Sequence, residues 1–170
     1  MKIKISIIAF LILLASCCQS NSENNKKQYS VSLQNNKTAT TEKIEFTPLV
    51  DLENAIQIGK KSKKNVLLYF TSYACVNSRK LEDNILTDSQ VKSLLTENFS
   101  FFIAYLDDRA LDKSTNSTVG KRFGKLQKEK FKSIEQPYFY IIDYNGKVLS
   151  EISYTNDKEA FIAFLEKGLK

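Results

Sequence analysis

The fold is decided by the stretch Val66-Leu67-Leu68-Tyr69-Phe70-Thr71-Ser72-Tyr73-Ala74-Cys75-Val76-Asn77-Ser78-Arg79-Lys80. The apolar run over 65–71 predicts a central strand covered on both faces, and a helix is expected from Cys75 to about Leu86. A cysteine at a helix N-terminus lies beside unpaired backbone N–H groups and the positive end of the helix dipole, which favour the thiolate. Such positions lower a cysteine pKa from about 8.5 to roughly 3.5–7.5. The stretch therefore predicts a reactive thiol at Cys75.

The sequence on both sides of this stretch alternates strand-like and helix-like patterns, which predicts an α/β domain over residues 44–170. We expect strands at 44–46, 65–71, 99–106, 138–143 and 147–154, and a polar loop at 107–118. Helices are expected to begin near Asp51, Cys75, Asp88 and Val119, and at Asn156 or Asp157. Asn145-Gly146 is a strong hairpin signal between the last two strands. Periodicity alone leaves more than one α/β sandwich open.

The N-terminus has the pattern of a targeting segment. Lys2 and Lys4 precede an apolar run, Ile5 to Ala15, that is too short for a membrane span but suits a signal peptide. The run ends in Leu14-Ala15-Ser16-Cys17, which resembles the lipobox of bacterial lipoproteins. We therefore predict a lipoprotein signal peptide over 1–16 and lipidation of Cys17. An ordinary cleaved signal peptide and a short uncleaved anchor are the alternatives.

Residues 17–43 are predicted to form a lipidated flexible tether. They are rich in Ser, Asn, Gln, Lys and Thr and contain almost no large apolar side chains, so burial cannot offset their ordering entropy. The expected location is the bacterial cell envelope, with the domain facing the periplasm or the exterior. Disulfide chemistry is permitted there. Cys18 is not explained by the lipobox; it is either a spare cysteine or a partner that the tether brings to Cys75.

Composition excludes several kinds of site. The 170 residues include no histidine and only three cysteines, which removes histidine-based catalysis and makes a zinc site improbable. The formal charge is +6, but we find no long basic run with interleaved aromatic residues, so nucleic acid is not an expected partner. We expect no metal and no other cofactor. A hydrophobic fraction of 42% is enough for a packed core.

Several motifs together resemble the C-terminal thioredoxin-like domain of DsbD-type thiol:disulfide interchange proteins. The resemblance covers residues 44–170 and rests on Phe70 to Glu82, Asp88-Ser89-Gln90-Val91, Tyr105-Leu106-Asp107-Asp108 and Gln136-Pro137-Tyr138. It implies a thioredoxin fold, in which a central mixed sheet is flanked by helices. It also implies that Pro137 follows a cis peptide bond beside Cys75, and that Gln136 presents its backbone to an extended peptide. Tyr73 is expected at the rim of this substrate-binding groove.

The departures from the family pattern concern the chemistry. Ser78 stands where the family has its second, resolving cysteine, so the site reads Cys-Val-Asn-Ser. Tyr69 stands where the family has a buried Asp that is thought to move a proton during resolution, and Ser72 replaces a Gly. A chain without the second thiol has no such proton step to assist. The site has therefore either changed its chemistry or given it up.

Two functions remain open. The first is monothiol thiol:disulfide exchange, in which Cys75 is the nucleophile and Ser78 donates a hydrogen bond to its thiolate. Its partners would be cysteine-containing envelope proteins or small thiols, with an electron-supplying membrane redox protein as a further candidate. The second is a redox-inactive binding module that uses the same groove. The protein is an enzyme only if the first function is correct, and we favour thiol:disulfide exchange.

Overall fold

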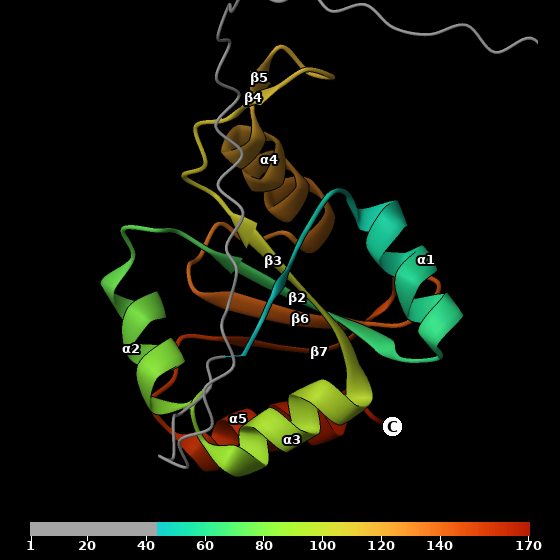
Figure 1. Cartoon of the computed structure of the whole chain (residues 1–170), viewed down its shortest axis with the longest axis vertical. Helices are drawn as coiled ribbons and strands as arrows, with labels where there is room; N and C mark the ends of the chain where they lie inside the picture. The colour runs from blue at the N-terminus through green and yellow to red at the C-terminus, as the bar shows by residue number, and fades with distance from the viewer. Residues whose placement is uncertain (1–43) are drawn as a thin grey trace, which may run out of the picture. The chain divides into compact units, whose positions relative to one another are not determined.

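The computed structural model describes residues 44–170, which belong to one compact unit. The predicted signal peptide, the lipidation site Cys17, Cys18 and the tether over 17–43 lie outside the described residues. Within the described part, no helix has the length and apolar character needed to cross a membrane. The unit has helices on both faces of a central sheet (Figure 1).

The sheet has five strands in the order β1-β3-β2-β6-β7. β1 pairs parallel with β3 and β3 parallel with β2, whereas β6 runs antiparallel to β2 and β7 antiparallel to β6. The sheet is therefore mixed, as predicted. The strands are β1 (Thr47–Pro48), β2 (Asn65–Thr71), β3 (Phe99–Tyr105), β6 (Tyr138–Ile142) and β7 (Val148–Ser153).

Five helices complete the unit: α1 (Leu52–Ser62), α2 (Val76–Asn84), α3 (Ser89–Asn98), α4 (Val119–Phe131) and α5 (Lys158–Lys167). Carboxylates cap three of them. Asp51, Asp88 and Asp157 each accept a hydrogen bond from backbone N–H groups in the first turn of α1, α3 and α5, which satisfies donors that a helix leaves unpaired. The last helix is thus capped by Asp157, one of the two residues predicted for this position.

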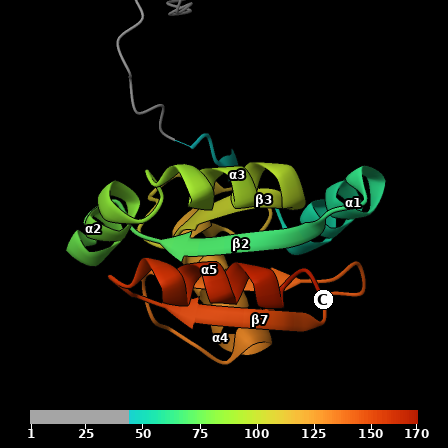
Figure 2. The ribbon, with the colours of Figure 1, turned by 90° about the horizontal axis from the view of Figure 1, so that it is seen from below.

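Successive side chains of β2 point to opposite faces of the sheet and divide the core into two clusters. Leu67 and Tyr69 face the side of α2, α3 and α5. Val66, Leu68 and Phe70 face the side of α1 and α4. Figure 2 views the sheet from the side of α3 and α5, with the broad faces of β2 and β7 toward the viewer. A complete sheet with a core on both faces is what an independently folding domain requires.

Two predicted segments differ from the structure. The first strand lies at Thr47–Pro48 rather than at 44–46, because the parallel register with Phe102 and Ile103 of β3 selects those residues. Ile44 and Phe46 instead pack as partly buried side chains against the cluster beneath α2 and α3. The predicted loop over 107–118 contains a two-stranded ribbon, formed by β4 (Leu111–Asp112) and β5 (Ser117–Thr118).

Candidate functional site

Cys75 lies in the turn between β2 and α2, at the N-cap position of α2. Its backbone is extended, with φ −79° and ψ 110°, and its side chain makes no capping hydrogen bond. Its backbone N–H donates to the carbonyl of Ser72 at 3.2 Å, and its carbonyl accepts from the N–H of Arg79 at 3.2 Å. The thiol is partly exposed and free. The sequence prediction that the cysteine stands where the helix begins is confirmed.

The loop before β6 lies next to the Cys75 thiol. The Gln136–Pro137 peptide bond is cis, as predicted, and Sγ of Cys75 lies 3.9 Å from the carbonyl oxygen of Gln136. Pro137 is buried while Gln136 is exposed. The two segments meet because β6 pairs antiparallel with β2, with Tyr138 opposite Phe70. The structure thus brings together three of the predicted site residues, Cys75, Gln136 and Pro137.

The turn before Cys75 is fastened to the end of β3 by Asp107. One carboxylate oxygen of Asp107 accepts from the N–H of Tyr73 at 2.9 Å, and the other accepts from the N–H of Ala74 at 3.2 Å. The sequence pattern over 107–118 predicts only a polar loop and does not indicate this role for Asp107. The available signal was topological, since β2 and β3 are parallel neighbours and the residues that follow their ends must lie close together.

Tyr73, predicted at the rim of the groove, stands on the exposed side of the same turn. Its ring stacks on that of Tyr105, with centroids 3.8 Å apart and planes 7° from parallel. The side chain is still 59% exposed, and its neighbour Val76 is 65% exposed. Partial burial, and then the charge of Asp108, raises the pKa of the Tyr73 hydroxyl above its ordinary value, so the group is neutral at physiological pH.

Ser78, predicted to donate a hydrogen bond to the Cys75 thiolate, lies in the interior of the domain. It is fully buried on the inner face of α2 together with Leu81. Its Oγ makes no hydrogen bond to any of the described residues, so the predicted hydrogen bond to the Cys75 sulfur is not formed. The reason is geometric: Cys75 precedes the helix in extended conformation and turns toward Gln136, whereas Ser78 follows the helical spacing that points it to the core.

A partly buried polar network joins Tyr69 to α2. The Tyr69 hydroxyl donates to Oε1 of Glu82 at 3.0 Å, and Arg79 forms an ion pair with the same oxygen at 2.7 Å. The Tyr69 ring stacks on Phe139, with centroids 4.2 Å apart. Burial raises the pKa of Tyr69 far above its ordinary value, so the phenol stays protonated and serves as a donor. Tyr69 therefore acts at this position as a neutral hydrogen-bond donor.

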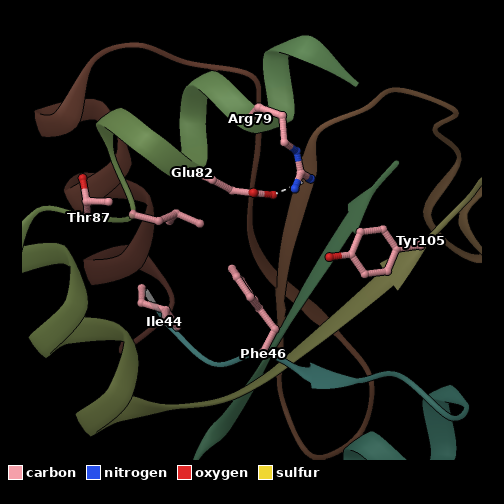
Figure 3. A pocket seen from close by; sticks show the side chains of 7 residues that line it. Ile44, Phe46, Arg79, Glu82, Thr87 and Tyr105 are labelled. Carbon is pink, nitrogen blue, oxygen red and sulfur yellow. Dashed lines mark ion pairs between the residues drawn. The ribbon is translucent and has the colours of Figure 1, made fainter. Parts of the chain in front are cut away.

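A cavity of about 200 Å³ opens behind the turn that carries Cys75. Arg79 and Tyr105 reach both places, since Arg79 also lies 3.5 Å from the carbonyl of Ser72 and Tyr105 stacks on Tyr73. Among residues 44–170, no group of His, Cys, Asp or Glu is arranged to hold a metal ion. Figure 3 shows the cavity, which is lined by Ile44, Phe46, Arg79, Glu82, Leu86, Thr87 and Tyr105.

Comparisons with known proteins identify the family and the fold. A family model described as a thioredoxin-like domain matches residues 52–169. Among solved structures, the chain resembles a DsbH oxidoreductase at 17% identity, covering 83% of this chain and 94% of that one, with a TM-score of 0.60. It also resembles a thioredoxin from Thermus thermophilus at 16% identity, with coverage of 74% and 87% and a TM-score of 0.56.

A third similar structure is the oxidised C-terminal domain of DsbD from Neisseria meningitidis. Its identity to this chain is 17%, the match covers 74% of this chain and 99% of that one, and the TM-score is 0.52. At such identities these likenesses concern the fold alone. A search of the curated proteins found no match.

Proposed function

Because the chain belongs to the thioredoxin-like domain family, we propose that it carries out thiol–disulfide exchange at Cys75. The observation that carries this proposal is the position of Sγ, at the start of α2 and 3.9 Å from the carbonyl of Gln136 before a cis-proline. An extended peptide that pairs with the backbone at Gln136 would present its own sulfur to that thiol. The exposed side chains of Tyr73 and Val76 would form the rim of the groove.

The exchange is of the monothiol kind. The Cys75 thiolate attacks one sulfur of a disulfide, a mixed disulfide forms, and the other sulfur leaves as a thiolate. Ser78 stands in the place of the family's resolving cysteine, and a hydroxyl does not displace sulfur from a disulfide. A second thiol, from the client, a small molecule or another protein, must therefore attack the mixed disulfide and release Cys75. The net result is exchange or isomerisation, with no change in the number of disulfides.

The proposed setting is the bacterial cell envelope, where a lipid on Cys17 and the tether over 17–43 would hold the domain at a membrane. The support is the lipobox-like sequence, which lies outside the described residues. The proposed clients are cysteine-containing envelope proteins or small thiols. An electron-supplying membrane redox protein is a further proposed partner, because a monothiol site needs an external thiol to regenerate it.

The direct test uses the folded unit, residues 39–170, in which Cys75 is the only cysteine. Glutathione disulfide is added at neutral pH, and the mixed disulfide is followed by mass spectrometry in the folded and the urea-unfolded unit. We expect faster adduct formation in the folded unit, because a helix N-terminus stabilises the thiolate. Cys75→Ser is expected to abolish the adduct.

A second variant tests the monothiol step itself. Ser78→Cys introduces a thiol one turn after Cys75, and rotation of that side chain toward Cys75 would let it displace glutathione and form an internal disulfide. The adduct should then be transient, whereas the wild-type adduct persists until a reductant is added. Modification of Cys75 only after unfolding, or an adduct formed no faster than in the unfolded chain, would refute thiol exchange as the function.

The exposed aromatic and aliphatic rim favours one alternative, a binding module that needs no thiol. Tyr73 and Val76 are both largely exposed on either side of Cys75, and exposed apolar side chains that gather in one place mark binding surfaces. A partner held by this rim would still bind after Cys75→Ser. Loss of binding in that variant, together with trapped mixed disulfides in the wild type, would favour exchange.

A further inference from the structure

The outer face of α4 carries a row of exposed lysines. The helix buries Phe123, Gln127 and Phe131 against the sheet. Lys121, Lys125 and Lys128 follow one another at spacings of four and three residues, so they lie on one side of the helix, and all three are exposed, as is Lys132 just beyond the helix end. The one carboxylate of α4, Glu129, lies 3.9 Å from Lys125 with both side chains largely in solvent. The positive charge of this face is therefore only weakly compensated.

Exposed apolar side chains stand at both ends of this helix. Leu111 and Ile134, at 81% and 73% exposure, are the two most exposed large hydrophobic residues of the described domain. Leu111 pairs in the β4–β5 ribbon with Thr118, which is the N-cap of α4. Figure 1 shows the ribbon beside the start of the helix. Ile134 follows the other end of the helix by three residues.

Contacts from α4 hold both of these flanking segments in place. Arg122 forms an ion pair with Asp112 at 2.5 Å and donates to the carbonyl of Val50 at 2.7 Å, which fixes the ribbon that bears Leu111. Gln127, fully buried, donates to the carbonyl of Glu135 at 2.8 Å, which fixes the segment that bears Ile134. The two exposed apolar side chains thus stand on segments that contacts with α4 hold in place.

We propose that this surface, formed by Lys121, Lys125, Lys128, Lys132, Leu111 and Ile134 and named here the α4 face, docks on a bilayer with anionic headgroups. Lysines near such a surface are attracted to it by the negative surface potential. Apolar side chains beside them gain by entering the boundary between headgroups and acyl chains. A nucleic acid would leave Leu111 and Ile134 in water and would find no aromatic side chain among the residues of this face.

The docking would place the proposed groove at the membrane surface. Ile134 precedes Gln136 by two residues, and Gln136 is the residue whose carbonyl meets Cys75. Clients at the bilayer would then be favoured over those in bulk solution. The inference goes beyond thiol exchange and does not depend on it, because none of the residues of the α4 face takes part in the exchange chemistry.

The test measures co-sedimentation of residues 39–170 with vesicles of phosphatidylglycerol and, separately, of phosphatidylcholine. This unit lacks the predicted leader and Cys17, so binding cannot come from them. We expect binding to the anionic vesicles and little to the zwitterionic ones. The triple variant Lys121→Gln, Lys125→Gln, Lys128→Gln should lower the partition coefficient by at least roughly tenfold.

Matched controls separate this face from net charge. Lys60→Gln, Lys61→Gln, Lys63→Gln removes the same charge from exposed positions at the end of α1 and should leave binding within about threefold of the wild type. Leu111→Ser and Ile134→Ser should each weaken binding several-fold, whereas Ile58→Ser, an exposed aliphatic residue on α1, should not. Cys75→Ser should bind vesicles like the wild type, which keeps this test apart from that of the exchange function.

Two outcomes would overturn the proposal. One is the absence of binding to phosphatidylglycerol vesicles by the wild-type unit, which would leave the α4 face to an acidic protein partner. The other is an equal loss of binding in the two triple-lysine variants, which would assign the attraction to overall charge. Circular dichroism of each variant checks that the fold is unchanged.

Discussion

Cys75 and Ser78 lie one turn apart at the start of α2, yet their side chains differ in exposure to solvent. Cys75 is partly exposed and lies against the exposed residue Gln136, whereas Ser78 is fully buried on the inner face of α2. The first side presents a thiol, and the second supports the helix that holds it. Substitutions on the exposed side should therefore change reactivity, and those on the buried side should change stability.

The largest effect is expected on the buried side, from Leu81→Ala. Leu81 is fully buried on the inner face of α2, and its truncation leaves a cavity, so the free energy of unfolding should fall by about 2–5 kcal/mol. Urea unfolding measures the change. Val76→Ala, on the exposed side of the same helix, is the control and should stay within about 0.5 kcal/mol of the wild type. Similar losses in the two variants would contradict the division into two sides.

Tyr69→Phe tests the hydrogen bond beneath α2. The substitution removes the donor that lies 3.0 Å from Glu82 and keeps a ring that can stack on Phe139. A hydrogen bond to a charged, largely buried carboxylate is worth about 1.5–3 kcal/mol, so we expect a loss of that order in urea unfolding. Tyr73→Phe is the matched control, since that hydroxyl belongs to an exposed side chain. An unchanged stability of Tyr69→Phe would show that the network does not support the helix.

Asp107→Asn tests the exposed side. The asparagine amide has one acceptor oxygen, and its NH₂ group cannot accept from a backbone N–H. The turn before Cys75 therefore loses one of the two hydrogen bonds that Asp107 accepts from it. We expect the rate of adduct formation with glutathione disulfide to fall by roughly fivefold, the equivalent of about 1 kcal/mol. Asp108→Asn removes the same charge from the next residue, which makes no hydrogen bond to this turn, and should react at nearly the wild-type rate. Equal rates in the two variants would assign any effect to charge.

The smallest expected effect is the response of the β4–β5 ribbon, which contains Asp112, to low pH. Hydrogen bonds from Ser114, with help from Arg122, lower the pKa of Asp112 to about 2. Because the pKa is lowered in the folded state, the ionised carboxylate stabilises the ribbon at pH values above the ordinary pKa of an aspartate. This stabilisation is lost as the pH falls toward 2 and the carboxylate is protonated. The NMR signal of the Ser114 N–H, 2.9 Å from the carboxylate, should therefore shift with a midpoint near pH 2. A midpoint near the ordinary value, or the same titration in Asp112→Asn, would contradict this.

Local sequence patterns were sufficient to predict several elements of the fold. The apolar run over 65–71 predicted β2, the carboxylates at 51, 88 and 157 predicted helix starts, and Cys75 was placed correctly at the start of α2. The motif around Pro137 predicted its cis bond and its place beside the thiol. These features follow from short-range periodicity, capping chemistry and a recognisable pattern, all of which are written within a few consecutive residues.

Features that depend on pairing between distant segments could be known only from the folded chain. The parallel register of β3 moved the first strand to Thr47–Pro48 and set Asp107 against the turn before Cys75. The direction of one helix face buried Ser78 and removed the hydrogen bond predicted for it. Arg122 and Gln127 fixed the exposed ends of the α4 face. Such contacts join residues far apart in the chain, so they are determined by strand register and packing, which local sequence patterns do not contain.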